Sequence, residues 1–225
     1  MEKEIIDFKE WTVPEKWEDL SLQTFQDIER YYVDKENADI RDIIHILCNK
    51  TIDEVNQLPS DFLSIIMSKL SFMSEPPEVK EPSLQIEIDG EKYRVNIKEK
   101  LRTGEYIAVE MAMKADKHDL ASILAILCRK DGELYDAEFE AEKLQQRREM
   151  FLKQPATKVL PIVNFFIQAY MTLEAPSQLC MVLEGELNHI QKNIKTSRNI
   201  GIGRKFFMNW RVKRLQKLLR SIKSH

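Results

Sequence analysis

The chain has 225 residues, of which 43% are hydrophobic and 32% are charged, a composition that excludes a disordered protein. Its six glycines favour a mostly helical fold, and its three widely spaced cysteines argue against a disulfide framework or a zinc knuckle. The net charge of −3 conceals a strong asymmetry, because eleven lysines and arginines and no acidic residue follow Glu186.

An aromatic arm precedes the first predicted helix. The arm contains Trp11, Pro14 and Trp17. We expect these residues to pack on the body of the protein; the alternative is that they dock on a partner. The helix is expected to begin near Ser21. Its single apolar face contains Phe25, Ile28 and Tyr32.

Three further helices are predicted before residue 74. The first spans Ile40–Cys48, and its inward residues are Ile43, Ile44 and Leu47. Thr51 and Glu54 fit a capping box, which satisfies free amides at a helix start, so a short helix ending near Leu58 is expected. The third helix covers residues 60–73, and its apolar stripe is placed by Phe62, Ile65, Ile66, Lys69 and Leu70.

A proline-rich linker and a β-hairpin follow. Residues 74–83 contain three prolines, which remove amide donors and favour extended backbone, so this segment is the best domain boundary. Residues 84–97 alternate apolar and polar side chains around Asp89–Gly90, a dipeptide that tolerates the positive φ of a type I′ turn. A two-residue turn places Ile86 opposite Tyr93 and Leu84 opposite Val95. Because a lone two-stranded ribbon is marginal, this face must rest on helices.

Four helices are predicted beyond the hairpin, over residues 104–115, 118–128, 137–153 and 156–173. The segments 120–128 and 159–167 are so apolar that they must be covered on more than one side. Pro155 stands at a helix start, whereas Pro161 is expected to kink this helix or to move its start downstream. A helix over 176–195 and a flexible joint at 199–203 precede the last segment.

Three polar clusters are better explained by structure than by chemistry. His45 and Cys48 could share a helix face, but two ligands do not hold a metal. Near a helix start, Asp116 or Lys117 is better explained as a cap than as part of a catalytic cluster with His118 and Asp119. An acidic run is expected to pair with basic residues three and four positions away on one solvated helix face. Its acids are Glu138, Glu140, Glu142 and Glu149, and its bases are Lys143, Arg147 and Arg148.

The residue types also limit the classes of function. No glycine-rich phosphate loop, nucleophile paired with a base or metal-ligand spacing occurs, so we expect no cofactor, no metal and no enzymatic activity. The first residues lack the apolar core of a signal peptide, and no 18 apolar residues run together, so we expect neither secretion nor a membrane span. Cys48, Cys128 and Cys180 lie in apolar segments and are expected to be buried free thiols.

The strongest functional candidate is a basic amphipathic helix over residues 204–223. The last 39 residues carry a charge of about +11, against about −14 for the first 186. The helix could pack on the acidic body, dock on another acidic protein as a helix in a groove, or contact nucleic acid or an anionic membrane. The partner-binding residues expected in it are Arg204, Lys205, Phe207, Trp210, Arg211, Lys213, Arg214, Leu215, Lys217, Leu218 and Arg220.

Two passages of the chain combine several short motifs. The first passage comprises Trp17–Glu29, Asp42–Leu47, Leu58–Pro59 and Leu70–Met73. The second comprises Thr103–Glu110, Leu124–Arg129, Tyr135, Arg147–Pro155 and Phe165–Phe166. Both passages resemble the phage tail and baseplate assembly proteins, which include tail assembly chaperones. In that group a threonine-glycine-aromatic helix start, a leucine-alanine-isoleucine-leucine helix and an arginine-to-phenylalanine-to-proline segment recur in this order. The similarity covers about two thirds of the chain, from Trp17 to Ile167.

The resemblance implies a non-enzymatic protein made during infection that holds or joins tail components. Such a protein is expected in the host cytoplasm, the virion tail being the alternative. Its expected partners are other phage tail or baseplate proteins, and a homo-oligomer is a further option. The shared positions look structural, so no functional residue is carried over. The basic segment after Gly203 departs from the pattern of the group.

We therefore predict a mainly α protein with two helical units. The expected parts are a helical unit over 1–73, a linker over 74–83, a hairpin with a second helical unit over 84–200, and a basic helix over 201–225. Our first functional hypothesis is a chaperone-like assembly factor of a tailed phage. The second is a permanent structural component of the tail or its connector, and the third is a nucleic-acid-binding protein that uses the basic helix.

Overall fold

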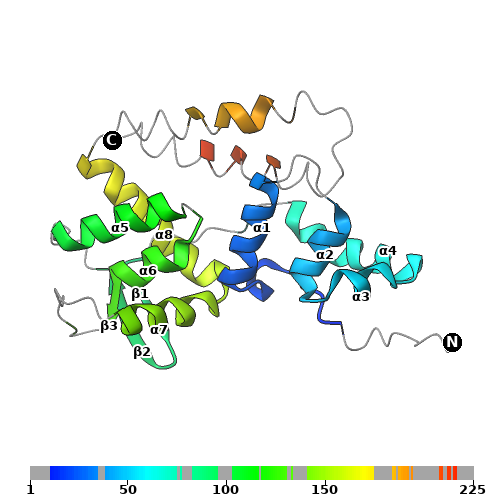
Figure 1. The fold of residues 1–225 in the computed structure, drawn as a ribbon, viewed down its shortest axis with the longest axis horizontal. Helices are drawn as coiled ribbons and strands as arrows, with labels where there is room; N and C mark the ends of the chain where they lie inside the picture. The colour runs from blue at the N-terminus through cyan, green and yellow to red at the C-terminus, as the bar shows by residue number, and fades with distance from the viewer. Residues whose placement is uncertain are drawn as a thin grey trace.

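The computed structural model of the chain is mainly helical, with a small antiparallel sheet of three strands (Figure 1). This architecture confirms the predicted fold class. The structure describes residues 11–34, 39–74, 77, 83–95, 103–116, 118–130, 133, 141–174, 184–185, 187–192, 194, 208–209, 212–213 and 215–216.

The first part of the chain forms a buried arm and a series of short helices. They are η2 (Trp17–Asp19), α1 (Leu22–Asp34), α2 (Ile40–Cys48), α3 (Ile52–Asn56), α4 (Ser60–Lys69) and η3 (Leu70–Ser74). Trp11 and Trp17 are buried, and the ring of Trp17 meets those of Phe25 and Phe72 edge-on at 6.4 and 5.3 Å. The prediction that the arm packs on the body is therefore confirmed.

Local capping explains where two of these helices begin. Asp39 caps α2 by accepting a hydrogen bond from the amide of Arg41. Thr51 and Glu54 form the predicted capping box at the start of α3, each side chain accepting from the other residue's amide. The helix predicted over residues 60–73 is not continuous, because it tightens into the 3-10 turn η3 at Leu70. Ile65 was expected in its inward stripe but is 43% exposed, so that assignment is wrong.

The hairpin has the predicted turn and register. Strands β1 (Gln85–Ile88) and β2 (Glu91–Val95) pair with Ile86 opposite Tyr93. Asp89 and Gly90 have φ values of 52° and 78°, the two positive values that a type I′ turn requires. The predicted support by helices is also present, since α8 (Ala156–Glu174) contacts β1 and the ring of Tyr93 meets that of Phe151 at 6.1 Å.

A third strand corrects the prediction of a helix over residues 118–128. The helix is α6 (Leu120–Leu127), and the chain then straightens into β3 (Cys128–Lys130), which pairs antiparallel with β2. Cys128 lies opposite Val95, and its backbone is extended at φ −94° and ψ 123°. The sheet order is β1-β2-β3. Tertiary pairing with β2 therefore overrides the helical pattern at the end of this apolar segment.

Helix α6 is the most deeply buried element of the described chain. Seven of its eight residues are buried, Ser122 being the exception. It contacts α5 (Thr103–Ala115), α7 (Ala141–Leu152), α8 and α1. The expectation that this segment is covered on several sides is confirmed. Pro161 lies inside α8, which nevertheless begins at Ala156, so the helix start is not moved downstream.

Adjacent arginines of α7 hold the two ends of α6. Arg147 donates to the carbonyl oxygen of Ala125 at 3.0 Å, near the C-terminal end of α6, and also pairs with Glu133. Arg148 donates to the carboxylate of Asp119 at 2.9 Å, at the N-cap of α6. These contacts correct the prediction that both arginines pair with glutamates along their own helix. Residues 134–140, which include Glu138 and Glu140, lie outside the described residues.

One core cluster joins the first and second halves of the chain. Helix α1 lies between α2–α4 on one side and α5–α8 with the sheet on the other (Figure 1). It contacts α2 as well as α6, α7 and α8, and its residues Leu22, Phe25 and Ile28 are fully buried. Beside it, Ser21 pairs with Pro155 in an isolated β-bridge. The division into two helical units is thus not confirmed, and most of the predicted linker lies outside the described residues.

Candidate protein-binding surface

The structure describes two of the eleven residues that the sequence singled out in the C-terminal segment. Lys213 is exposed and Leu215 is buried, and the described positions around them are helical as predicted. Met208, seven residues before Leu215, is buried as well, so two positions on one face of a helix are covered. The predicted residues outside the described part are Arg204, Lys205, Phe207, Trp210, Arg211, Arg214, Lys217, Leu218 and Arg220.

His45 and Cys48 lie at the C-terminal end of α2 and have structural roles there. A ring N–H of His45 donates to the carbonyl oxygen of Lys50, which follows the C-cap residue of the helix. Burial raises the pKa of the Cys48 thiol to about 11, so it stays protonated at neutral pH and is a poor nucleophile or ligand. Burial also raises the pKa of Cys128 to about 12. In the described part of the chain, no group of His, Cys, Asp and Glu side chains could hold a metal ion.

The Asp116, His118 and Asp119 cluster joins helices instead of forming a catalytic group. Asp119 is the N-cap of α6, a role that the sequence gave to Asp116 or Lys117. The carboxylate of Asp116 accepts from the His118 amide and from Arg30 of α1, both at 2.8 Å. Burial favours a higher pKa for Asp116, but these two donors outweigh it and hold the pKa below the ordinary value. The carboxylates are thus already engaged in structural hydrogen bonds.

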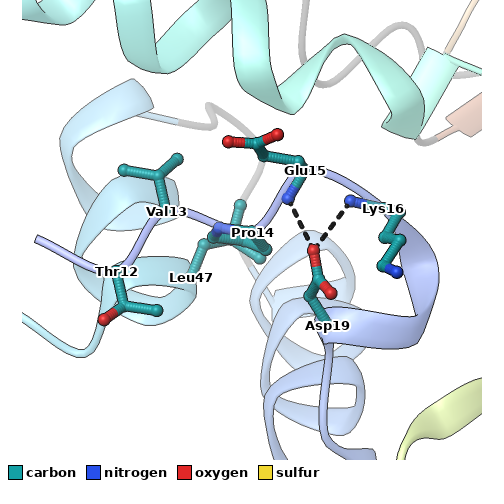
Figure 2. Close-up of a pocket in the computed structure, with 7 residues that line it drawn as sticks. All are labelled: Thr12, Val13, Pro14, Glu15, Lys16, Asp19 and Leu47. Carbon is teal, nitrogen blue, oxygen red and sulfur yellow. Dashed lines mark hydrogen bonds between the residues drawn. The ribbon is translucent and has the colours of Figure 1, made fainter.

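A groove of about 740 Å³ lies between the arm and the end of α2 (Figure 2). Its charged lining residues are used in local structure: the carboxylate of Asp19 accepts from the amides of Glu15 and Lys16 at 3.0 and 3.2 Å. Glu15 also pairs with Lys69 at 2.6 Å. The remaining lining residues are Thr12, Val13, Pro14 and Leu47. This lining provides no paired acid and base, so the groove does not resemble an active site.

The outer face of α5 is the best candidate for binding a partner. Among the described residues, three large hydrophobic side chains are exposed, and two of them lie one turn apart on this helix: Ile107 is 48% exposed and Met111 is 66% exposed. Gly104 and Ala115 are exposed on the same side, where the exposed Lys114 also lies, seven residues after Ile107. We call Gly104, Ile107, Met111 and Ala115 the α5 face.

The opposite side of α5 fixes the helix to the body. Val109 is fully buried in the core. Glu105 pairs with Arg129 of β3 at 2.5 Å, and both side chains are about nine-tenths buried. The α5 face is therefore presented by an anchored helix. The apolar periodicity of the sequence did not reveal the α5 face. Residues 107–109 and 111–113 are all apolar, so no polar side of the helix marks which face is exposed.

No protein-family model, curated protein or solved structure matches the chain. In the part of the chain that the structure describes, no helix combines the length and apolar character needed to cross a membrane. The function is therefore inferred from the residues and from the geometry of the α5 face.

Proposed function

We propose that the protein is a non-enzymatic assembly factor of a tailed phage, which holds other tail or baseplate proteins in the host cytoplasm during infection. The observation that carries the proposal is the α5 face, which lies on an anchored helix and leaves Met111 largely and Ile107 about half exposed to solvent. Contiguous exposed apolar surface is one of the marks of a protein-binding site. The threonine-glycine-aromatic helix start that resembles the tail assembly group belongs to this same helix.

The polar clusters are already held in structural hydrogen bonds, which supports a role in protein binding over a role in catalysis. The carboxylates of Asp116 and Asp119 accept hydrogen bonds from backbone amides and from arginines, and the thiols of Cys48 and Cys128 are buried with raised pKa values. A catalytic group needs a free reactive atom within reach of a substrate. In this proposal the α5 face holds the partner, and the basic C-terminal segment adds electrostatic attraction to acidic partner surfaces.

Mass spectrometry of purified virions beside infected-cell lysate tests this proposal. We expect abundant peptides of this chain in the lysate and none above background in virions. Equal abundance in both would instead support the second hypothesis, a permanent structural component. Phage carrying the Ile107→Glu and Met111→Glu changes should yield fewer tailed particles, because the added charges oppose partner binding. Ile65→Glu, at an exposed site on α4, is the matched control and should leave the yield unchanged.

A salt series separates the third hypothesis from the other two. Binding to nucleic acid through phosphate contacts weakens steeply with ionic strength, whereas binding through apolar side chains persists. We expect a partner complex captured from lysate to survive an increase from about 0.05 to 0.2 M salt, a range over which phosphate binding loses about a thousandfold or more in affinity. Loss of the complex over this range would favour nucleic-acid binding.

A further inference from the structure

Met111 is the most exposed of the sulfur-containing side chains whose burial the structure describes. It is 66% exposed on α5, whereas Met73 is 8% exposed and Met208 is 7% exposed. Three further methionines are half-buried: Met67, Met113 and Met150. A dissolved oxidant attacks the sulfur atom of methionine directly, so a difference in exposure to solvent is also a difference in reactivity.

The cysteines of the described chain do not compete with Met111 for an oxidant. Cysteine reacts with peroxides as the thiolate. Cys48 and Cys128 are buried, and burial raises their pKa values to about 11 and about 12, so both remain protonated thiols at neutral pH. A thioether has no proton to lose, and its reactivity needs no ionisation. Met111 is therefore the sulfur side chain of the described chain that is both open to solvent and reactive at neutral pH.

We propose that Met111 is a site of reversible oxidation, at which a peroxide converts the thioether to the sulfoxide in the folded protein. The sulfur lone pair attacks one oxygen of hydrogen peroxide and the O–O bond breaks, so that sulfur is oxidised by two electrons and the peroxide is reduced. The hydroxide that leaves takes the proton of the new S–OH group and becomes water. A sulfoxide reductase that uses a dithiol reverses the step: the oxygen leaves as water and the dithiol becomes a disulfide.

The position of Met111 allows this oxidation without loss of the fold. A sulfoxide is polar, and a polar group in the core is costly without a hydrogen-bond partner, whereas most of Met111 already meets water. The buried Val109 and the pair of Glu105 with Arg129 hold α5 from its other side. Oxidation thus makes one of the two large exposed apolar side chains of α5 polar while the helix stays in place. Its consequence for a bound partner, a weaker hold at the α5 face, rests on the proposed function.

Met113 supplies a matched control on the same helix. It lies about 200° further round α5 than Met111, is half-buried and packs against the central core. Trypsin cleaves after Arg102 and Lys114, so both methionines fall in one peptide of residues 103–114, in which fragment ions locate the added oxygen. Met73 falls in a separate peptide of residues 70–80 and reports on a methionine of the core.

The test treats the full chain with dilute hydrogen peroxide at neutral pH and follows each methionine by peptide mass spectrometry. In the folded protein we expect Met111 to be oxidised about tenfold or more faster than Met73, which reacts only when the core opens locally, and several-fold faster than Met113. In urea the three should react at similar rates. Oxidation of Met113 or Met73 as fast as that of Met111 in the folded protein would overturn the proposal.

Hydrophobic-interaction chromatography measures the change at the surface. The oxidised protein should elute earlier than the untreated protein with the same circular dichroism spectrum, and the two methionine sulfoxide reductases, one for each epimer, should restore its elution with dithiothreitol. Met111→Leu should keep its elution after the same peroxide treatment. Unchanged elution of the oxidised parent, or an equal shift in Met111→Leu, would refute the switch. These measurements use neither a partner nor virions, so this inference and the proposed function can fail separately.

Discussion

The pair formed by Glu105 and Arg129 shows how single residues hold the candidate surface in place. Glu105 lies in the first turn of α5, where the helix dipole favours a negative charge, and Arg129 reaches it from β3. Burial removes both charges from water, which costs several kcal/mol per ion unless each keeps its partner. Sequence reasoning placed Glu105 only within the helix predicted over residues 104–115, because its partner Arg129 lies 24 positions away in a strand that was not predicted.

Removing one member of this pair should therefore destabilise the protein strongly. We expect Glu105→Ala or Arg129→Ala to lower the free energy of unfolding by about 3 to 5 kcal/mol, since a buried charge then loses this ion pair. Lys114→Ala breaks the exposed Glu110–Lys114 pair on the same helix and should cost about 1 kcal/mol or less. Urea unfolding at neutral pH measures both changes. Equal effects of the buried and the exposed change would refute this account of how α5 is anchored.

The elements that sequence predicted best are those that local residues determine. The hairpin turn follows from Asp89–Gly90 and the start of α3 from Thr51 and Glu54, so the structure matches the prediction at both. Strand β3 was missed because the three residues Cys128–Lys130 follow an apolar helical run, and their extended form depends on pairing with β2. The α5 face was missed for a related reason: which side of an apolar helix stays open depends on neighbours that are distant in sequence.

The hairpin turn gives a test at the level of the element. Gly90 has a φ of +78° and open space around its missing side chain, so Gly90→Ala adds backbone strain without a clash. We expect a loss of about 1 to 2 kcal/mol in the free energy of unfolding. Gly185→Ala also meets open space but stands in a helical stretch, so it should be neutral or stabilise by up to about 1 kcal/mol. Thermal unfolding of both variants distinguishes the two cases, and a neutral Gly90→Ala would contradict the type I′ turn.

At the scale of the whole molecule, the organisation of the chain follows the continuous core around α1 more than the proline-rich boundary. Leu22 and Phe25 belong to the same cluster as Ile44 of α2 and Val159 of α8. Sequence reasoning placed the boundary at residues 74–83 from prolines alone, because contacts between distant helices leave no local pattern. The charge asymmetry, in contrast, was readable from the sequence alone.

This core predicts one unfolding transition for the regions on both sides of the linker. Phe25→Ala on α1 should lower the free energy of unfolding by about 3 to 5 kcal/mol and should shift the whole transition. Urea unfolding followed by tryptophan fluorescence, which reports on the buried Trp11 and Trp17, should coincide with unfolding followed by far-ultraviolet circular dichroism. Two separate transitions, with only the first moved by Phe25→Ala, would restore the division into two units.

The bridge between Ser21 and Pro155 also bears on how the protein is made. These residues are 134 positions apart, and the backbone of Leu20 and Leu22 bonds to Ala156 and Gln154 beside them. At a synthesis rate of about 5–20 residues per second, the second partner leaves the ribosome roughly 7 to 27 seconds after the first. For most of that interval α1 has emerged before α6 and α7, and α8 follows only after it, although all three later contact α1. A protein proposed to shelter other chains therefore needs shelter for its own first helix while it is being translated.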